Sequence, residues 1–368
     1  MAHYYRNNQV VGWGPTVEEI SHLSKLFDTI THISFLYSGE APSSAIPYSA
    51  DNIHFVPLPP TGGDRFIDKL EILRASFLYL RTIATELSKA DIVHVRCPAN
   101  ISLLTIVFLS IVKYPRRRWV KYAGSWDFHA KVSLTSKFQK WWLNHGLHRG
   151  LVTVNGTWPG QPRHVHSFFN PCIDDDLLDQ LKTESSEKQL TYPLNILFAG
   201  RLSKEKGASR VIEIATKLHN LKIPIHVDIF GEGPELPWMK EKIIEFGLRD
   251  QVKLHGWVAH NELLPFYKTA HFILLPSDSE GWPKVLSEGM ACGAVPVASR
   301  VGSIPELLNQ FGIGRICEVD HVEGYANAIL DYFQNPEKWT IESKNAFKNA
   351  HLFTYGYYIK RVSELLGL

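Results

Sequence analysis

Two glutamates, Glu280 and Glu288, stand on either side of a Gly-Trp-Pro turn in the stretch SDSEGWPKVLSEGMACG. Such a turn can open a helix, and Pro283 suits the first helical position. The backbone amides of a first helical turn have no partners within the helix, so they attract anions. The amides expected at this start belong to Trp282, Lys284 and Val285.

The spacing of the two acids suggests what they would bind. Glu288 would lie about one and a half turns into the helix, since a turn takes about 3.6 residues, and this is too far to cap it. Its carboxylate can accept two hydrogen bonds from a vicinal diol such as that of a ribose. Glu280 can accept hydrogen bonds from the hydroxyls of a second ring. The stretch therefore predicts a site for a phosphate between two sugars. The alternative is a capping Glu280 and a solvated Glu288.

Two further turns follow apolar runs of the strand type. In NILFAGRLSKEKG, Arg201 and Lys206 could neutralise a diphosphate, although two solvated loop cations would look the same. In VDIFGEGPE, Gly231 and Gly233 would let a base or a phosphate approach the backbone, or would only form a tight connection. Ligands of parallel sheets bind at such carboxyl ends of strands.

The first half of the chain offers weaker candidates. Gly14, in VVGWGP, could admit a phosphate or an acceptor to a helix start, but Val17 stands where a dinucleotide motif needs its third glycine. Asp127 and His129 follow the apolar run WVKYAG, and either could orient or deprotonate an acceptor hydroxyl. Asp127 could equally be a loop acid paired with a lysine.

We predict no metal site. The run Asp174–Asp176 is the only acidic cluster, and it falls in a polar stretch where it more simply starts a helix. His164 and His166 alternate on a short apolar run, which is more typical of strand residues that differ in exposure. With Arg201, Lys206 and helix amides around a diphosphate, a departing nucleotide needs no cation.

Short apolar runs alternate with longer amphipathic ones along the whole chain, which predicts an α/β fold with parallel sheets. The expected strands are 31–37, 91–96, 119–124, 151–156, 195–200, 225–231, 271–276 and 295–299. The clearest expected helices are 65–89 and 208–221. The polar stretch 172–193 breaks the alternation. We therefore expect an N-terminal domain of residues 1–184, a C-terminal domain of residues 185–353, and a final amphipathic helix at 354–368.

Charge and composition limit the function. The chain has 368 residues and a net charge of +2, so nothing in the overall charge indicates nucleic acid. Four scattered cysteines and an N-terminus without an apolar signal core favour the cytoplasm. Residues 113–170 nevertheless carry ten Lys or Arg and one acid, interleaved with tryptophans. This favours attachment to an anionic membrane surface over an ordinary basic face.

These motifs, in this order over residues 195–308, resemble the retaining nucleotide-sugar glycosyltransferases of family 4. The matching elements are GRLSKEKG, FGEGPE, the run VKLHGWVAHNELLPFYKTAHFILLPS, and the two glutamates with the GMACGAVPVASRVGSIPELL continuation. The resemblance implies a GT-B fold, in which two Rossmann-like domains face a cleft, and in which the C-terminal domain binds the donor and the N-terminal domain binds the acceptor. It implies transfer of a sugar from a nucleoside diphosphate to a glycan or lipid-linked acceptor, without a metal and with retention. The final helix would cross back onto the first domain.

Carried over by motif position, the resemblance assigns roles to individual residues. Arg201 and Lys206 would face the diphosphate, Glu288 the ribose, and Glu280 the transferred sugar. Amides of residues 281–284, starting at Gly281, would assist, and residues 256–258, ending at Val258, would lie near the base. The Trp282-Pro283-Lys284 segment departs from the usual phenylalanine and small residue. His271 stands where many members carry aspartate. The competing functions are an epimerase or phosphorylase of the same architecture, and a nucleotide-sugar binder without catalysis.

Overall fold

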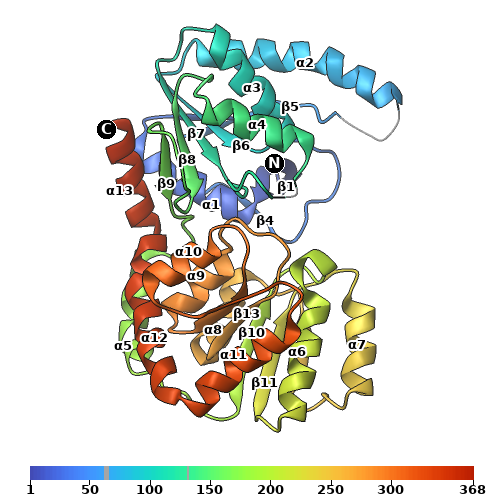
Figure 1. Ribbon diagram of the computed structural model, residues 1–368. Helices are drawn as coiled ribbons and strands as arrows, with labels where there is room; N and C mark the ends of the chain where they lie inside the picture. Colours follow the sequence, from blue (N-terminus) through green and yellow to red (C-terminus); the bar gives the residue numbers. More distant parts are fainter. Residues whose placement is uncertain (62–65, 131) are drawn as a thin grey trace. The chain divides into compact units, whose positions relative to one another are not determined.

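The computed structural model describes residues 1–61, 66–130 and 132–368 (Figure 1). The chain divides into unit 1, made of Met1–Phe168 and Tyr358–Leu368, and unit 2, made of Phe169–Tyr357. The boundary expected between residues 184 and 185 therefore lies earlier, after Phe168. The cause is local: the stretch taken for a linker contains α5 (Asp175–Ser186), whose Leu181 is buried in a core of unit 2.

Unit 1 contains two sheets. The first has the strand order β4 (Ala45–Pro47), β2 (Gln9–Trp13), β1 (Ala2–Arg6), β3 (Ile30–Leu36) and β5 (Ile53–Leu58). Its β1–β2 and β2–β4 pairs are antiparallel, which the alternation did not predict. The β1–β2 hairpin turns at Asn7 and Asn8, both with positive φ, as a two-residue hairpin turn of type I′ requires.

The second sheet of unit 1 is entirely parallel. Its order is β6 (Ile92–Cys97), β7 (Arg117–Tyr122), β8 (Leu151–Asn155) and β9 (Val165–Phe168). Side chains alternate across it: Val120 packs in one core cluster and Trp119 in another. The first cluster includes residues of α2 (Phe66–Leu87), α3 (Asn100–Ile111) and α4 (Leu134–Asn144).

A buried carboxylate joins the remaining helices of unit 1 to this sheet. Glu19 lies on α1 (Gly14–Leu23) and is 3% exposed. Its Oε1 accepts hydrogen bonds from Arg96 (2.6 Å), from Lys121 (2.7 Å) and from the hydroxyl of Tyr358 (2.7 Å). Burial alone would raise the pKa of Glu19, but the two cations hold it well below its usual range. Tyr358 belongs to the final helix α13 (Tyr355–Leu366), so the expectation that this helix returns to the first domain is confirmed.

Unit 2 is built on one parallel sheet of six strands. The order is β12 (Val252–Gly256), β11 (Ile225–Phe230), β10 (Leu194–Ala199), β13 (Phe272–Leu275), β14 (Val295–Ser299) and β15 (Arg315–Cys317). The strands predicted at 195–200, 225–231, 271–276 and 295–299 match β10, β11, β13 and β14 within one residue at either end. The α/β class with parallel sheets is confirmed.

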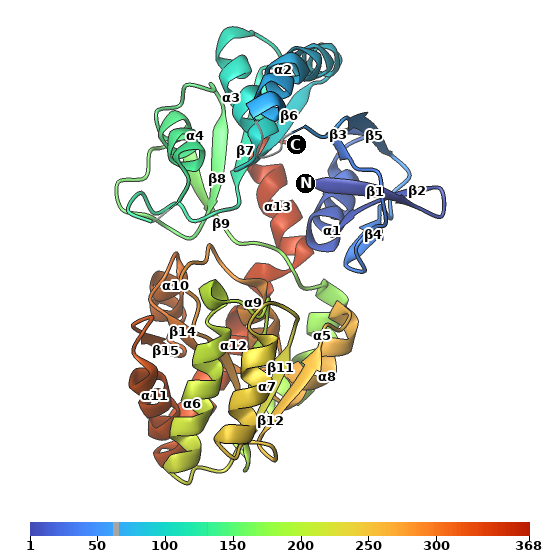
Figure 2. The same ribbon diagram turned by 90° about the vertical axis from the view of Figure 1, so that its right-hand side faces the viewer.

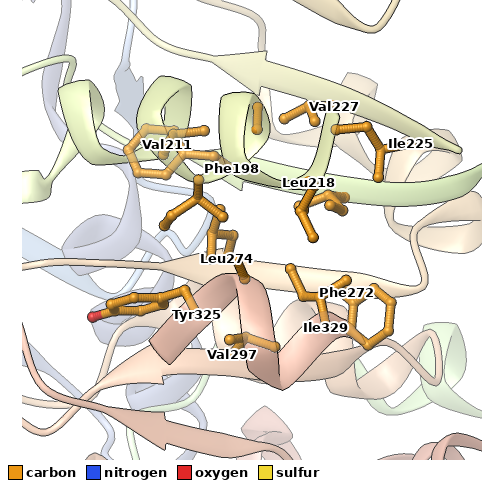
Figure 3. Packing of buried hydrophobic residues seen from close by; sticks show 14 of the residues in the cluster. Phe198, Val211, Leu218, Ile225, Val227, Phe272, Leu274, Val297, Tyr325 and Ile329 are labelled. Carbon is orange, nitrogen blue, oxygen red and sulfur yellow. The ribbon is translucent and has the colours of Figure 1, made fainter. Parts of the chain in front are cut away.

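Helices cover both faces of this sheet. One face packs against α6 (Ala208–Asn220), α7 (Leu236–Glu245) and α11 (Val322–Gln334), which Figure 2 shows side by side. Figure 3 shows the core beneath α6 and α11, with Val211, Leu218 and Ile329 against strand residues such as Phe272. The other face is covered by the following helices: α5, α8 (Leu264–Thr269), α9 (Lys284–Ala291) and α10 (Ile304–Phe311). Helix α12 (Pro336–Asn349) contributes to both cores, with Trp339 in the first and Ala346 in the second.

The basic stretch of unit 1 is only partly a surface feature. Arg118 is 5% exposed, and its guanidinium donates hydrogen bonds to main-chain oxygens that include those of Pro115 and Val112. Lys121 is buried against Glu19, and the ammonium of fully buried Lys140 donates to the carbonyl of Asp127. These three cations therefore make hydrogen bonds or ion pairs inside unit 1. The interpretation of residues 113–170 as one basic surface is corrected accordingly, because these three side chains are not exposed on it.

Among the described residues, no helix combines the length and the apolar character that crossing a membrane requires. None of the four cysteines, all of which lie in the described chain, forms a disulfide, and all four are buried.

Candidate donor-binding site

The strand order of unit 2 places two of the predicted turns at one point. From β10 the chain proceeds outward through β11 and β12, then returns to the centre and proceeds the other way through β13, β14 and β15. The order therefore reverses between β10 and β13, and ligands of open parallel sheets bind beyond the carboxyl ends of strands at such a reversal. The segment 200–207 follows β10, and the segment 276–283 follows β13. They carry the predicted cations and the first predicted acid.

Three glycines allow the loops at this edge to touch. A Cβ on Gly207 would lie 2.0 Å from the carbonyl oxygen of Pro276, and a Cβ on Gly231 would lie 1.9 Å from that of Gly200. A Cβ on Gly302, after β14, would lie 2.0 Å from the carbonyl oxygen of Glu280. All three glycines also have positive φ, which side chains disfavour. Of the two roles predicted for Gly231, the structure shows the tight connection, because its Cα lies against the backbone of Gly200.

Lys206 and Glu280 form an ion pair across these loops. The Lys206 Nζ lies 2.6 Å from Glu280 Oε1, and the two side chains are 38% and 9% exposed. The backbone nearby is fixed as well, because Ser303 donates to the carbonyl of Gly281 from its hydroxyl (2.9 Å). A cation predicted at a diphosphate and an acid predicted at a sugar therefore meet in the folded chain.

Arg210, which the sequence analysis did not single out, holds the loop that leads to Glu280. It lies in the first turn of α6, and its guanidinium donates to the carbonyl of Pro276 (2.6 Å) and pairs with Asp278 (2.6 Å) and Asp320 (2.9 Å). The only sequence signal was its position, four residues after Lys206. Arg201, by contrast, is exposed to solvent at the end of β10.

The start of α9 differs from the expectation in two respects. Pro283 is the residue before the first helical residue, Lys284, and no side chain caps this end. The side chain of Trp282 is 4% exposed, stacks on Phe353 with ring centroids 5.3 Å apart, and donates from Nε1 to the hydroxyl of Ser287 (2.6 Å). Its indole is thus part of the core. The sequence analysis placed the backbone amide of Trp282 at the site, and that role stays a prediction, but the buried indole is not available to contact a donor sugar.

Glu288 already has two partners. Its Oε2 accepts a hydrogen bond from the hydroxyl of Tyr267 on α8 (2.7 Å), and its Oε1 accepts one from Nε2 of His260 (2.9 Å). The Glu288 side chain is 11% exposed. Burial would raise its pKa, but the hydrogen bonds from His260 and Tyr267 and the charge of Lys284 lower it below its usual value. Glu288 is therefore a held, ionised acceptor rather than a solvated helix residue.

The remaining predicted positions are placed as follows. Val258 is half-buried against the core beneath α9, two residues after β12. In unit 1, Asp127 Oδ1 accepts a hydrogen bond from the backbone amide of His129 (2.8 Å), and the His129 side chain is exposed. The amide of Gly14 donates to the carbonyl of Ser44 (3.2 Å). This amide is therefore not available to the phosphate that the sequence analysis allowed for at this helix start.

Two predicted packing roles can be compared with the structure. His271 is 2% exposed, and its Nδ1 accepts a hydrogen bond from the backbone amide of Asn195 (2.9 Å), as a packing histidine would. His164 bonds through Nε2 to the carbonyl of Leu143 (2.8 Å). Within the described ranges, no three His, Cys, Asp or Glu side chains are grouped so as to hold a metal ion.

Sequence comparison finds a known protein family in part of the chain. Residues 182–350 match the family described as glycosyl transferases group 1. A D-inositol 3-phosphate glycosyltransferase 1 of Catenulispora acidiphila is 25% identical over 58% of this chain and 53% of its own. A 2-deoxystreptamine N-acetyl-D-glucosaminyltransferase of Niallia circulans is 31% identical over 46% of this chain and 42% of its own. The chain thus spans about half the length of these curated relatives.

Solved structures extend the likeness to the whole chain at the level of fold. Alr3699/HepE of Anabaena, solved with UDP-glucose, is 16% identical and superposes with a TM-score of 0.66 over 100% of this chain and 98% of its own. Sucrose-phosphate synthase of Thermosynechococcus elongatus is 15% identical, with a TM-score of 0.68 over 95% and 90%. Residues 182–350, all within unit 2, thus match the group 1 glycosyl transferases, and the chain as a whole has the GT-B fold of these solved structures.

Proposed function

We propose that this protein is a retaining glycosyltransferase that moves a sugar from a nucleoside diphosphate to a hydroxyl of a glycan or lipid-linked acceptor. The observation that carries the proposal is the meeting of Lys206 with Glu280, beside the start of α9 and at the reversal point of the sheet. Polysaccharide or glycolipid synthesis is the corresponding pathway class. The UDP and UDP-glucose complexes of the similar HepE structures support the choice of donor class.

The proposed site divides the donor between charged and polar groups. The diphosphate lies against the uncapped start of α9, near the amides of Gly281 and Lys284, where the helix dipole favours negative charge. Lys206, at 38% exposure, can turn from Glu280 to the phosphates, and Arg201 is exposed nearby in sequence to do the same. The departing diphosphate is thus stabilised by the two cations and by helix amides, so we propose that no metal or other cofactor takes part.

The two carboxylates then contact the two sugars. Glu288, held by Tyr267 and His260, accepts from the ribose, with Val258 and its neighbours near the base. Glu280 accepts hydrogen bonds from hydroxyls of the transferred sugar. Its Oε1 becomes available for this when Lys206 turns to the phosphates. Asp127 or His129 of unit 1 receives the proton of the acceptor hydroxyl, which attacks from the face that the nucleotide leaves.

Release of nucleoside diphosphate tests this proposal. The protein is incubated with nucleotide sugars and a lipid extract, with and without EDTA, and the anomeric configuration of the product is read by NMR. We expect release that EDTA does not abolish, a retained configuration, and a loss of about 100-fold in Glu288→Gln, since charged hydrogen bonds contribute about 1.5–3 kcal/mol each. Glu241→Gln, on the exposed side of α7, is the control. Unchanged release in Glu288→Gln would contradict the site, and donor conversion without transfer would indicate an epimerase instead.

We also propose peripheral attachment of unit 1 to an anionic membrane surface. On α4, Leu134 (83% exposed), Phe138 (40%) and Trp141 (47%) recur at helical spacing and form one exposed apolar stripe. The helix contains no acid, and Lys137 is exposed within it. Exposed cations elsewhere in residues 113–170 are Lys113, Arg116, Arg117, Arg149 and Arg163. An apolar stripe with cations suits the interface of an anionic bilayer.

Vesicle flotation tests the attachment. At low salt we expect the protein to float with vesicles containing phosphatidylglycerol and to remain below with pure phosphatidylcholine. The double variant Phe138→Ser, Trp141→Ser should lose most of this binding, whereas Leu221→Ser, which changes an exposed leucine of unit 2, should keep it. Equal recovery with both lipids, or none with either, would remove this part of the proposal.

A further inference from the structure

His260 and Tyr267 are the two residues whose side chains hold Glu288, and neither belongs to the set predicted from sequence. Tyr267 is 3% exposed and approaches Oε2 from inside the unit, whereas the His260 side chain is 60% exposed and approaches Oε1 from the solvent side. The carboxylate is therefore held from two directions, by one interior group and one surface group.

The acceptor capacity that remains on Glu288 matches a diol. An ionised carboxylate offers about four lone-pair positions on its two oxygens. Tyr267 occupies one position on Oε2 and His260 one on Oε1, so each oxygen keeps one. Two vicinal hydroxyls, which are two donors a short distance apart, can use both. A single hydroxyl can use only one.

The two holding residues are themselves fixed by short local elements. His260 opens a 3-10 turn (His260–Leu263), and Glu262 closes that turn by accepting from the amide of Ala259 (3.0 Å). The carbonyl of Tyr267 accepts a hydrogen bond from Lys188 Nζ (3.2 Å), which also bonds to the carbonyls of Ala270 and Cys292. The ammonium thus ties the ends of α8 and α9 together, so Tyr267 and Glu288 keep their relative position.

We propose that His260 and Tyr267 are positioning residues that fix the rotation of the Glu288 carboxylate so that it accepts both hydroxyls of a ribose, and that they thereby select ribonucleotides over 2′-deoxyribonucleotides. The inference rests on the proposed function, because it assumes that Glu288 meets the ribose of the donor. It adds the specificity of that contact and the residues that set it. Without His260, the carboxylate can rotate about its terminal bond, and the second hydroxyl loses a fixed acceptor.

Calorimetric titration tests the proposal with UDP, ADP and their 2′-deoxy forms. For whichever base binds, wild-type protein should bind the ribonucleotide about tenfold more tightly than the deoxy form, as expected for one lost hydrogen bond to a charged group. In His260→Ala this ratio should fall to about twofold, and ribonucleotide binding should weaken about tenfold. His260→Gln, which keeps an N–H donor, should restore part of the ratio. Tyr267→Phe should also lower it. His219→Ala, at the end of α6, is the matched control.

Kinetics supply a second readout that a merely structural role would not move. In His260→Ala the KM for the donor should rise about tenfold, while kcat changes less than threefold. If wild-type protein binds none of these diphosphates, the proposed donor site itself is wrong, and this inference with it. If wild-type protein binds and discriminates, but His260→Ala keeps the same ratio between ribose and deoxyribose, the donor site stands and the positioning role of His260 is refuted.

Discussion

Two glycines with nearly the same backbone conformation allow a direct test of how tightly the donor-site loops are packed. Gly207 has φ +69°, and a Cβ there would lie 2.0 Å from the carbonyl oxygen of Pro276. Gly247, after α7, has φ +68°, and a Cβ there would have nothing within 4 Å. Alanine at either position has the same backbone strain, and only Gly207→Ala also has the clash.

The expected magnitudes follow from these two terms. The left-handed conformation costs an L-residue roughly 1–2 kcal/mol, so Gly247→Ala should lower the free energy of unfolding by about that amount. Overpacking in a close contact typically adds about 1–3 kcal/mol. Gly207→Ala should therefore cost about 2–5 kcal/mol, and the upper part of this range applies because the contact is with a main-chain carbonyl that cannot rotate away.

The assay is urea unfolding of both variants and of the wild type, combined with titration of the nucleoside diphosphate that binds. Gly207→Ala should separate the loops after β10 and β13, and the ion pair between Lys206 and Glu280 spans these loops. We therefore expect nucleotide binding to weaken at least tenfold in Gly207→Ala and to remain unchanged in Gly247→Ala. Equal losses of stability in the two variants, or normal binding by a destabilised Gly207→Ala, would refute the argument that these loops are held by close contact.

Three further outcomes are expected. Glu19→Gln leaves a buried lysine uncompensated, so urea unfolding should show a loss of about 3–5 kcal/mol. Stability should fall between pH 6.5 and 4, because burial lowers the pKa of His3, His148 and His271 from 6.5 to about 4 in the fold, so that only the unfolded chain gains these protons. At pH 5 each of these histidines lowers the free energy of unfolding by about 2 kcal/mol. A melting temperature independent of pH over this range would contradict the prediction. Trp282→Phe should lower the free energy of unfolding by about 1–3 kcal/mol through the lost indole hydrogen bond, yet leave the donor KM within about twofold. A large rise in KM would indicate that the indole contacts the sugar after all.

Sequence patterns predicted the second unit better than the first for a physical reason. The strands β13 and β14 of the unit 2 sheet are fully buried and appear as continuous apolar runs, such as FILL in β13, so their positions can be read directly. The strands β12 and β15, which are largely half-buried, were not predicted. The strands β1 and β2 are short and half-exposed, and their runs, such as AHYYR, contain polar residues. The hairpin signal was the Asn7-Asn8 pair, a weaker form of the usual turn with glycine.

The candidate site shows the same division between local and non-local information. Residues that act through backbone conformation or position in a motif, such as Gly231 and Glu280, were found from the sequence. Residues that act by contact between distant segments were not: Tyr267 reaches Glu288 from another helix, and Arg210 reaches Pro276 across the sheet edge. The burial of Trp282 was missed because its partner, Phe353, is 71 positions further along the chain.

The return of the last eleven residues to unit 1 has a consequence for how the chain is made. A ribosome adds residues in order at about 5–20 per second, so Glu19, Arg96 and Lys121 are synthesised long before Tyr358. The nascent first unit must wait for the entire second unit to be translated before its fourth hydrogen-bonding group arrives. During that interval the apolar residues that later meet Val362 and Leu366 are uncovered, and they are where a chaperone would bind the growing polypeptide.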